Sequence, residues 1–148
     1  MANLLALTKA YPSLVLERGD TLIEAGEARG DLFILVSGRL KVVRDGVEIA
    51  RIAEPGTLVG EMSVLLGTDH SATVTALTPV EVRHIEDGLH WLENSNIAAL
   101  HVATLACQRL DATSALLVEL KKEAAGNRDQ GLLERLFGTI TGAETRAS

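Results

Sequence analysis

Short apolar runs separated by turns dominate the first part of the chain. Between residues 14 and 85, runs rich in Leu, Ile and Val alternate with segments that contain Gly, Asp or Pro. This pattern is typical of an all-β sandwich or barrel. The dipeptide Asp45-Gly46 lies between two such runs and is a strong β-hairpin signal. We therefore predict a mainly β fold with flanking helices, an eight-stranded jelly-roll barrel that strands at 72–77 and 80–85 would close.

The spacing of apolar residues becomes helical from Glu86 to about Ala125. Asn94-Ser95-Asn96 offers an N-cap for the longest helix. Within this helix, apolar and small residues recur in steps of four and three, which is the spacing of a coiled-coil seam. These positions are Ala99, Ala103, Ala106, Leu110, Thr113, Leu117, Leu120 and Ala124. We predict a homodimer whose seam is formed by Ala103, Ala106, Leu110, Leu117 and Leu120.

The pattern divides the chain into three parts. Residues 1–93 form the predicted β-roll sensor domain, with a Leu-rich helix near its start that packs against the sheet. Residues 94–125 form the long helix, and residues 126–148 form a short amphipathic helix and a tail. The roughly 20 residues of this last part are too few for a helix-turn-helix reader of DNA. We therefore expect no direct nucleic-acid partner.

The composition is that of a small globular module. The chain has 148 residues, of which 47% are hydrophobic, and this is enough for one domain with a substantial core. A formal net charge of −6 argues against a broad phosphate-binding surface. Cys107 is the single cysteine, so no disulfide can form within the chain. No apolar stretch approaches the ~20 residues that cross a bilayer, and we expect a cytoplasmic protein without a membrane partner.

The residues that carry metal or catalytic chemistry are dispersed in the sequence. The four histidines are His70, His84, His90 and His101, and none forms a closely spaced pair. Metal ligands need convergent geometry, so we expect no metal site. Cys107 falls in a helical segment, and no Gly-x-Ser-x-Gly elbow exposes a serine nucleophile. Glu61 and His70 would be the one candidate acid–base pair, and we do not expect an enzyme.

Residues 60–74 carry the most informative motif, Gly-Glu-Met-Ser-Val-Leu-Leu-Gly-Thr-Asp-His-Ser-Ala-Thr-Val. The segment resembles the phosphate-binding cassette of the cyclic nucleotide-binding domain family, in which a Gly-Glu pair is followed by a short helix and then by Arg-[Ser/Ala]-Ala. The resemblance implies a regulatory module for a small anionic ligand, cyclic AMP or cyclic GMP, with no certain cofactor. It implies ligand-binding roles for Gly60, Glu61, Met62, His70, Ser71 and Ala72.

The family resemblance also implies how the cassette would hold its ligand. The Glu61 carboxylate accepts a hydrogen bond from the ribose hydroxyl, while amides at the start of the short helix face the cyclic phosphate. Ser71 adds a backbone N–H and a hydroxyl. Nine residues beyond Glu61, His70 occupies the position of the family's arginine.

His70 is the departure from the family pattern. An imidazole cannot reproduce the planar fork of donors with which arginine holds a phosphate. Loss of one partner of a buried charge pair typically costs ~2–5 kcal/mol, a roughly 30-fold to few-thousand-fold loss of affinity. A histidine beside an anion can take up a proton, so residual binding should strengthen as the pH falls. In the alternative interpretation, His70 is a loop residue beside a pocket that has lost its ligand.

A second, shorter resemblance lies on the long helix. Thr113 and Ser114 match a Thr-Ser pair that contacts the adenine in the dimer helix of the family's catabolite activator branch. Alternatively, both hydroxyls bond to carbonyls of the preceding helical turn, as Ser and Thr often do in helices. Two hypotheses therefore stand: a stand-alone regulatory ligand-binding module with an altered cassette, and a ligand-free interaction module that dimerises through the seam.

Overall fold

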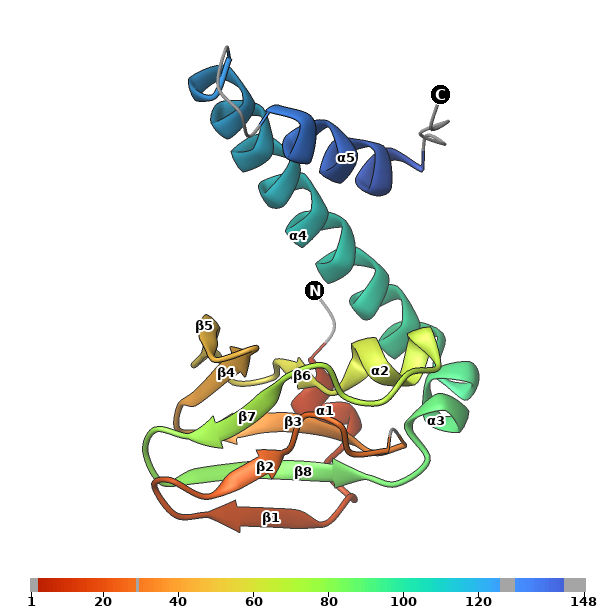
Figure 1. The fold of residues 1–148 in the computed structure, drawn as a ribbon. Coiled ribbons are helices and arrows are strands. Elements are labelled where there is room, and N and C mark those ends of the chain that lie inside the picture. Colours follow the sequence, from red (N-terminus) through yellow and green to blue (C-terminus); the bar gives the residue numbers. More distant parts are fainter. Residues whose placement is uncertain (1–2, 29, 126–129, 143–148) are drawn as a thin grey trace. The chain divides into compact units, whose positions relative to one another are not determined.

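Within the residues that the computed structural model describes, 3–28, 30–125 and 130–142, eight β-strands form two four-stranded antiparallel sheets (Figure 1). One sheet has the order β1 (Ser13–Leu16), β8 (Val80–Ile85), β3 (Leu32–Ser37) and β6 (Leu58–Val59). The other has the order β2 (Thr21–Ile23), β7 (Thr73–Ala76), β4 (Leu40–Arg44) and β5 (Val47–Ile52). All these strands belong to the first of two compact units, Met1–Val102 and Ala103–Ser148.

The predicted jelly-roll fold is confirmed, with one difference. The hydrogen-bonded ladders among the described strands stay within each sheet, so the sheets form two layers and not one closed barrel. The shortest strands, β2 and β6, lie at sheet edges and offer few backbone groups for pairing across the corner.

Strand β3 is buried on both of its faces. Phe33 and Leu35 point into the core between the sheets, together with Leu40 and Val82. The alternate residues of β3 face a second core beneath the helices. This second core contains Leu4, Leu32, Ile34, Leu58, Val64, Ile85, Leu92, Ala98 and Val102. Burial on two faces explains why β3 begins with an unbroken apolar run, whereas the neighbouring β8 carries polar residues between its buried ones.

Five helices are present among the described residues: α1 (Leu4–Leu7), α2 (Glu61–Leu66), α3 (Gly88–Asn94), α4 (Asn96–Glu123) and α5 (Gln130–Thr141). The predicted first helix is a single turn, which the side chain of Asn3 caps. In α4, the Ser95 hydroxyl accepts a hydrogen bond from the amide of Ala98 at 3.3 Å, inside the predicted capping segment. None of the described helices is both long enough and apolar enough to cross a bilayer.

The second unit contains most of α4 together with α5. Leu117 of α4 and Leu133 of α5 are both buried. Lys121 links the two helices, because its Nζ lies 3.7 Å from Glu134 Oε1 and 5.4 Å from the centre of the Phe137 ring. The boundary between the two units, Val102/Ala103, falls within the sequence of α4. The predicted domain boundaries at 93/94 and 125/126 stay a prediction.

Gly38 holds the turn between β3 and β4 in a conformation that other residues rarely adopt. Its φ is +91°, and a Cβ there would lie 2.2 Å from the carbonyl oxygen of Pro79. We expect Gly38→Ala to lower the free energy of unfolding by about 1–3 kcal/mol more than Gly19→Ala does. Gly19 is the matched control, because its φ is +90° and no atom lies within 4 Å of its virtual Cβ. Urea unfolding measures both, and equal losses would contradict the steric argument.

Candidate functional site

The cassette helix α2 begins at a glycine that lies close to two strands. Gly60 is the N-cap residue with φ +95°. A Cβ on Gly60 would lie 3.1 Å from the carbonyl oxygen of Asp31 and 3.5 Å from Ile23 Cδ1. The absence of a side chain therefore lets the start of the cassette approach the ends of β2 and β3.

Three hydrogen bonds hold His70 against its surroundings. Its backbone N–H donates to the carbonyl oxygen of Glu27 at 3.0 Å, and its own carbonyl oxygen accepts from the N–H of Gly26 at 2.8 Å. Its Nδ1 lies 2.9 Å from Ser63 Oγ, in the middle of α2. The backbone of His70 is therefore attached to the segment after β2, and its ring is attached to the cassette helix.

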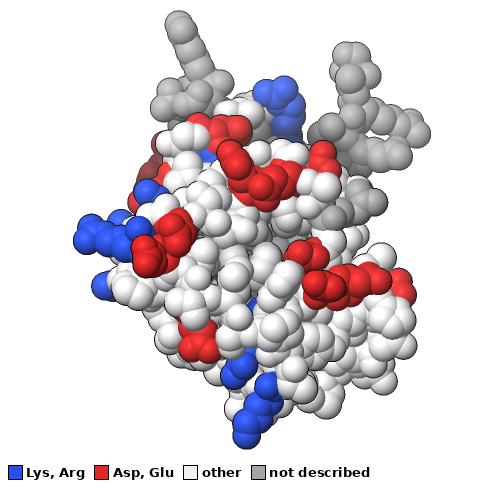
Figure 2. Space-filling model, turned by 90° about the horizontal axis from the view of Figure 1, so that it is seen from below, with Lys and Arg blue, Asp and Glu red and all other residues white. Residues whose placement is uncertain are grey.

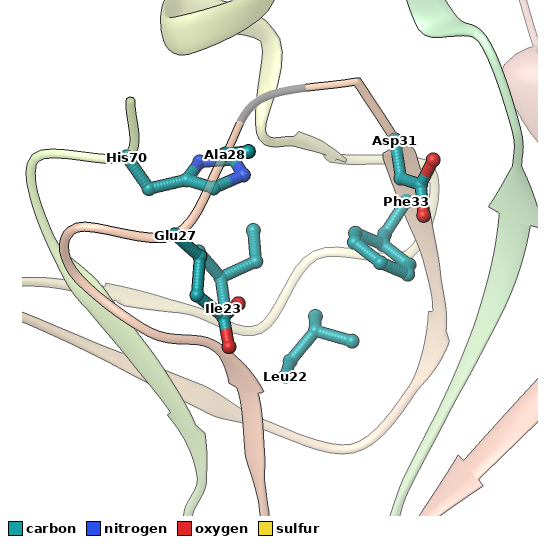
Figure 3. A pocket seen from close by; sticks show the side chains of 7 residues that line it. All are labelled: Leu22, Ile23, Glu27, Ala28, Asp31, Phe33 and His70. Atoms are coloured by element: carbon teal, nitrogen blue, oxygen red, sulfur yellow. The ribbon is translucent and has the colours of Figure 1, made fainter. Parts of the chain in front are cut away.

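His70 also lines a cavity of about 260 Å³ (Figure 3). The lining residues are Leu22, Ile23, Glu27, Ala28, Asp31, Phe33 and His70. In Figure 3, His70 and Glu27 lie on one side, Asp31 and Phe33 on the other, and Ile23 and Leu22 between them. The cavity thus combines an apolar floor with two carboxylates and one imidazole.

His84 on β8 fixes the far side of this cavity. Its Nε2 lies 2.8 Å from Asp31 Oδ2, and its ring stacks on Phe33 with 5.0 Å between ring centres and 14° between planes. Phe33 and His84 are direct cross-strand partners. On the other side, Glu27 Oε2 accepts a 3.3 Å hydrogen bond from the amide of Glu24, so each lining carboxylate has a partner within the protein.

Seen from below, basic and acidic side chains of the described residues lie in small groups separated by uncharged surface (Figure 2). A broad field of one sign would raise the local concentration of an oppositely charged ligand. The described residues form no such field over the face in this view.

The structure brings only part of the predicted ligand set to this cavity. Of the cassette residues, His70 lines it, whereas Gly60, Glu61, Met62, Ser71 and Ala72 are outside its lining. Gly60 is nonetheless close to His70, since its virtual Cβ lies 3.8 Å from His70 Cε1. Met62 is 56% exposed. Thr113 and Ser114 lie on α4 in the second unit, so their contact with a ligand stays a prediction.

Sequence reasoning missed Glu27, Asp31, Phe33 and Ser63. A usable signal was the segment 24–31, where two glycines and three carboxylates precede the continuous apolar run of β3. No group of three His, Cys, Asp or Glu side chains in the described part of the chain is placed to hold a metal ion.

A model of the cyclic nucleotide-binding domain matches residues 13–88, which include both sheets and the cassette. The chain belongs to the cyclic nucleotide-binding domain family. It is 28% identical over 152 residues to a CRP-like cAMP-activated global transcriptional regulator of Mycobacterium tuberculosis, covering 97% of this chain and 68% of the regulator. It is 34% identical over 64 residues to the cGMP-dependent protein kinase egl-4 of Caenorhabditis briggsae, covering 43% of this chain and 8% of the kinase.

The solved structure of the Thermus thermophilus catabolite activator protein has the same fold. The two structures superpose with a TM-score of 0.66 at 24% identity, over 81% of this chain and 60% of that protein. At this identity the likeness concerns the fold alone. The predicted family is therefore confirmed, while the ligand and the roles of single residues remain predictions.

Asp31 and His84 should stabilise the domain as a pair. Because the two side chains are partly exposed, we expect a double-mutant cycle with Asp31→Asn and His84→Gln to give a coupling of about 0.2–1 kcal/mol that weakens in high salt. Urea unfolding near pH 6 measures it, because histidine is partly protonated there. Asp31→Asn combined with His90→Gln is the control and should be additive. Additivity in both cycles would show that the ion pair does not hold Asp31.

Proposed function

We propose that this domain is a regulatory ligand-binding module in which His70 takes the place of the family's phosphate-binding arginine. The proposal rests on the position of His70, which lines the cavity and also contacts Ser63 of α2 through its ring. The ligand we propose is a cyclic nucleotide, cyclic AMP or cyclic GMP. The names of two relatives, a cAMP-activated regulator and a cGMP-dependent kinase, support this ligand class.

The charges at the cavity make binding weak near neutral pH. Two carboxylates, Glu27 and Asp31, and the imidazole of His70 are the ionisable side chains among its described lining residues. An anionic phosphate is repelled by the carboxylates and gains a positive partner only when His70 is protonated. Affinity is therefore lower than with an arginine at this position, and it rises as the pH falls.

The proposed output is the long helix. A ligand shifts a conformational equilibrium only by its differential affinity for the two arrangements. Glu61 and Ser71 in the cassette, with Thr113 and Ser114 on α4, are the residues through which a bound nucleotide would favour one arrangement of the helix. In this proposal the chain acts by binding and not by catalysis.

The decisive experiment is a calorimetric titration with cyclic AMP at pH 6 and pH 8. We expect stronger binding at pH 6 for the wild-type chain, because protonated His70 supplies the positive charge. His70→Arg should raise the affinity at pH 8 by roughly 30-fold or more and remove most of the pH dependence. Glu61→Ala should remove the ligand-dependent thermal shift, since the ribose hydroxyl loses its acceptor.

Controls separate loss of binding from loss of structure. Each variant should keep the circular dichroism spectrum of the wild type. Absence of heat in the wild type and in His70→Arg at both pH values would reject cyclic AMP as the ligand, and the same titration with cyclic GMP would follow.

A second candidate function is dimerisation through α4 without a ligand. Apolar residues on this helix are exposed within its own unit, among them Leu110 at 48% and Leu120 at 41%. Ala103 and Ala106 are exposed as well. Leu117 is buried in the second unit, so its substitution would disturb the packing of that unit and is a poor test of the seam.

Leu110→Asp should weaken such a dimer, because each protomer would bring an uncompensated carboxylate into an apolar seam. We expect the dimer dissociation constant to rise by roughly 30-fold or more, equivalent to ~2 kcal/mol. Light scattering over a dilution series measures it. Leu116→Asp is the matched control, because Leu116 is 55% exposed and lies off the predicted seam. Equal effects of both substitutions, or none from Leu110→Asp, would contradict the seam.

A further inference from the structure

The hydroxyl of Ser63 lies between two polar groups and has one proton for them. Ser63 Oγ donates to the carbonyl oxygen of Gly60 at 3.1 Å, and it lies 2.9 Å from His70 Nδ1. A serine hydroxyl can donate once and accept at its lone pairs. Both contacts are hydrogen bonds at the same time only if Nδ1 of His70 carries a proton and donates it to Ser63.

We infer that Ser63 is a positioning residue that fixes the neutral His70 ring in the tautomer with its proton on Nδ1. Ser63 is only 5% exposed, so water does not readily replace either partner. The arrangement with the proton on Nδ1 is the one in which both contacts of the hydroxyl are hydrogen bonds, and each such bond contributes about 0.5–1.5 kcal/mol. The backbone bonds of His70 to Gly26 and Glu27 hold the residue in the same place from the other side.

The tautomer determines which ring nitrogen of His70 can contact a ligand, and whether that nitrogen donates or accepts a hydrogen bond. With Nδ1 engaged by Ser63, Nε2 is the ring nitrogen left to meet a molecule in the cavity, and in the neutral ring it is an acceptor. The other ionisable groups of the described lining, the Glu27 and Asp31 carboxylates, are acceptors as well. A neutral His70 therefore gives an anion no side-chain donor from this set.

Within this set of lining residues, an anion therefore gains a side-chain donor only when His70 takes up one proton from solvent. This step rests on the proposed function, because it concerns the same cavity and the same class of ligand. The charged groups around the ring act in opposite directions. Glu27 and Asp31 line the cavity with His70 and would attract a positive charge on the ring, whereas both carboxylates would repel an anion; Asp31 also contacts His84 Nε2 at 2.8 Å. The site would thus report the joint presence of an anion and a proton.

The tautomer is testable without any ligand. Nitrogen-15 chemical shifts of the two ring nitrogens distinguish a protonated from an unprotonated nitrogen, and the His70 signals are those that disappear in His70→Asn. At about pH 8.5, where histidines are mostly neutral, we expect the proton on Nδ1 in the wild-type chain. Ser63→Ala should mix the two tautomers, and Ser63→Thr, which keeps the hydroxyl, should restore the wild-type pattern.

A binding measurement tests the consequence. Cyclic AMP titrations between about pH 7 and 8.5 should show affinity falling toward about tenfold per pH unit in the wild type, as one linked proton requires. Ser63→Ala should give a shallower slope, because a neutral ring can then place its proton on Nε2 and donate to the anion. Thr8→Val is the matched control: it removes another buried hydroxyl bond, from Thr8 to the carbonyl oxygen of Leu4, and should leave the tautomer and the slope unchanged.

The outcomes separate this inference from the proposed function. A wild-type His70 with its proton on Nε2, or an unchanged tautomer ratio in a folded Ser63→Ala, would overturn the role of Ser63. An Nδ1 proton that Ser63→Ala releases would support that role even if cyclic AMP gave no heat at any pH. The missing heat would then count against the proposed ligand alone.

Discussion

The arrangement of the first unit depends on a single strand that is buried on both faces. Phe33 and Leu35 of β3 hold the two sheets together, and Leu32 and Ile34 hold the helices against the outer side of the same strand. Fully burying one such side chain is worth about 1.5–3 kcal/mol, so four adjacent ones make β3 the element that is hardest to displace. Residues next to the start of β3 are therefore also held firmly in place.

The cavity is attached to that start. Asp31 immediately precedes β3, Phe33 lies within it, and His84 pairs with both from β8. The opposite side belongs to Glu27 and Ala28, which are exposed, and to His70, which is partly exposed. One side of the cavity is therefore a fixed wall, while the other is held mainly by hydrogen bonds between the loop, His70 and α2. A ligand that binds here can more easily reposition α2 than the sheet.

The secondary-structure elements could be predicted from the sequence, whereas the cavity could not. Asp45-Gly46 predicted a tight hairpin, and both residues have positive φ, 51° and 77°, as a type I′ turn demands. The helix after Asn94-Ser95-Asn96 and the short helix after Gly60 were also local signals. The cavity was not foreseeable in this way, because His70 reaches the segment of Glu27 and Asp31 only through pairing between distant parts of the chain. Ser63 and His70 are seven residues apart and come together only because the chain folds back after α2.

The proposed replacement of the family's arginine by His70 would change the kind of selectivity that the cassette can have. An arginine is permanently charged, so a site built on it responds to the anion alone. A histidine has two nitrogens and a proton that can leave, and the cassette must then specify which nitrogen meets the ligand. We infer that Ser63 does so from within α2, the helix whose N-cap residue is Gly60. Ser63 therefore links Gly60, at the start of α2, to the ring of His70, which is the only candidate cation among the described lining residues. A substitution at either end of this link should affect the other end.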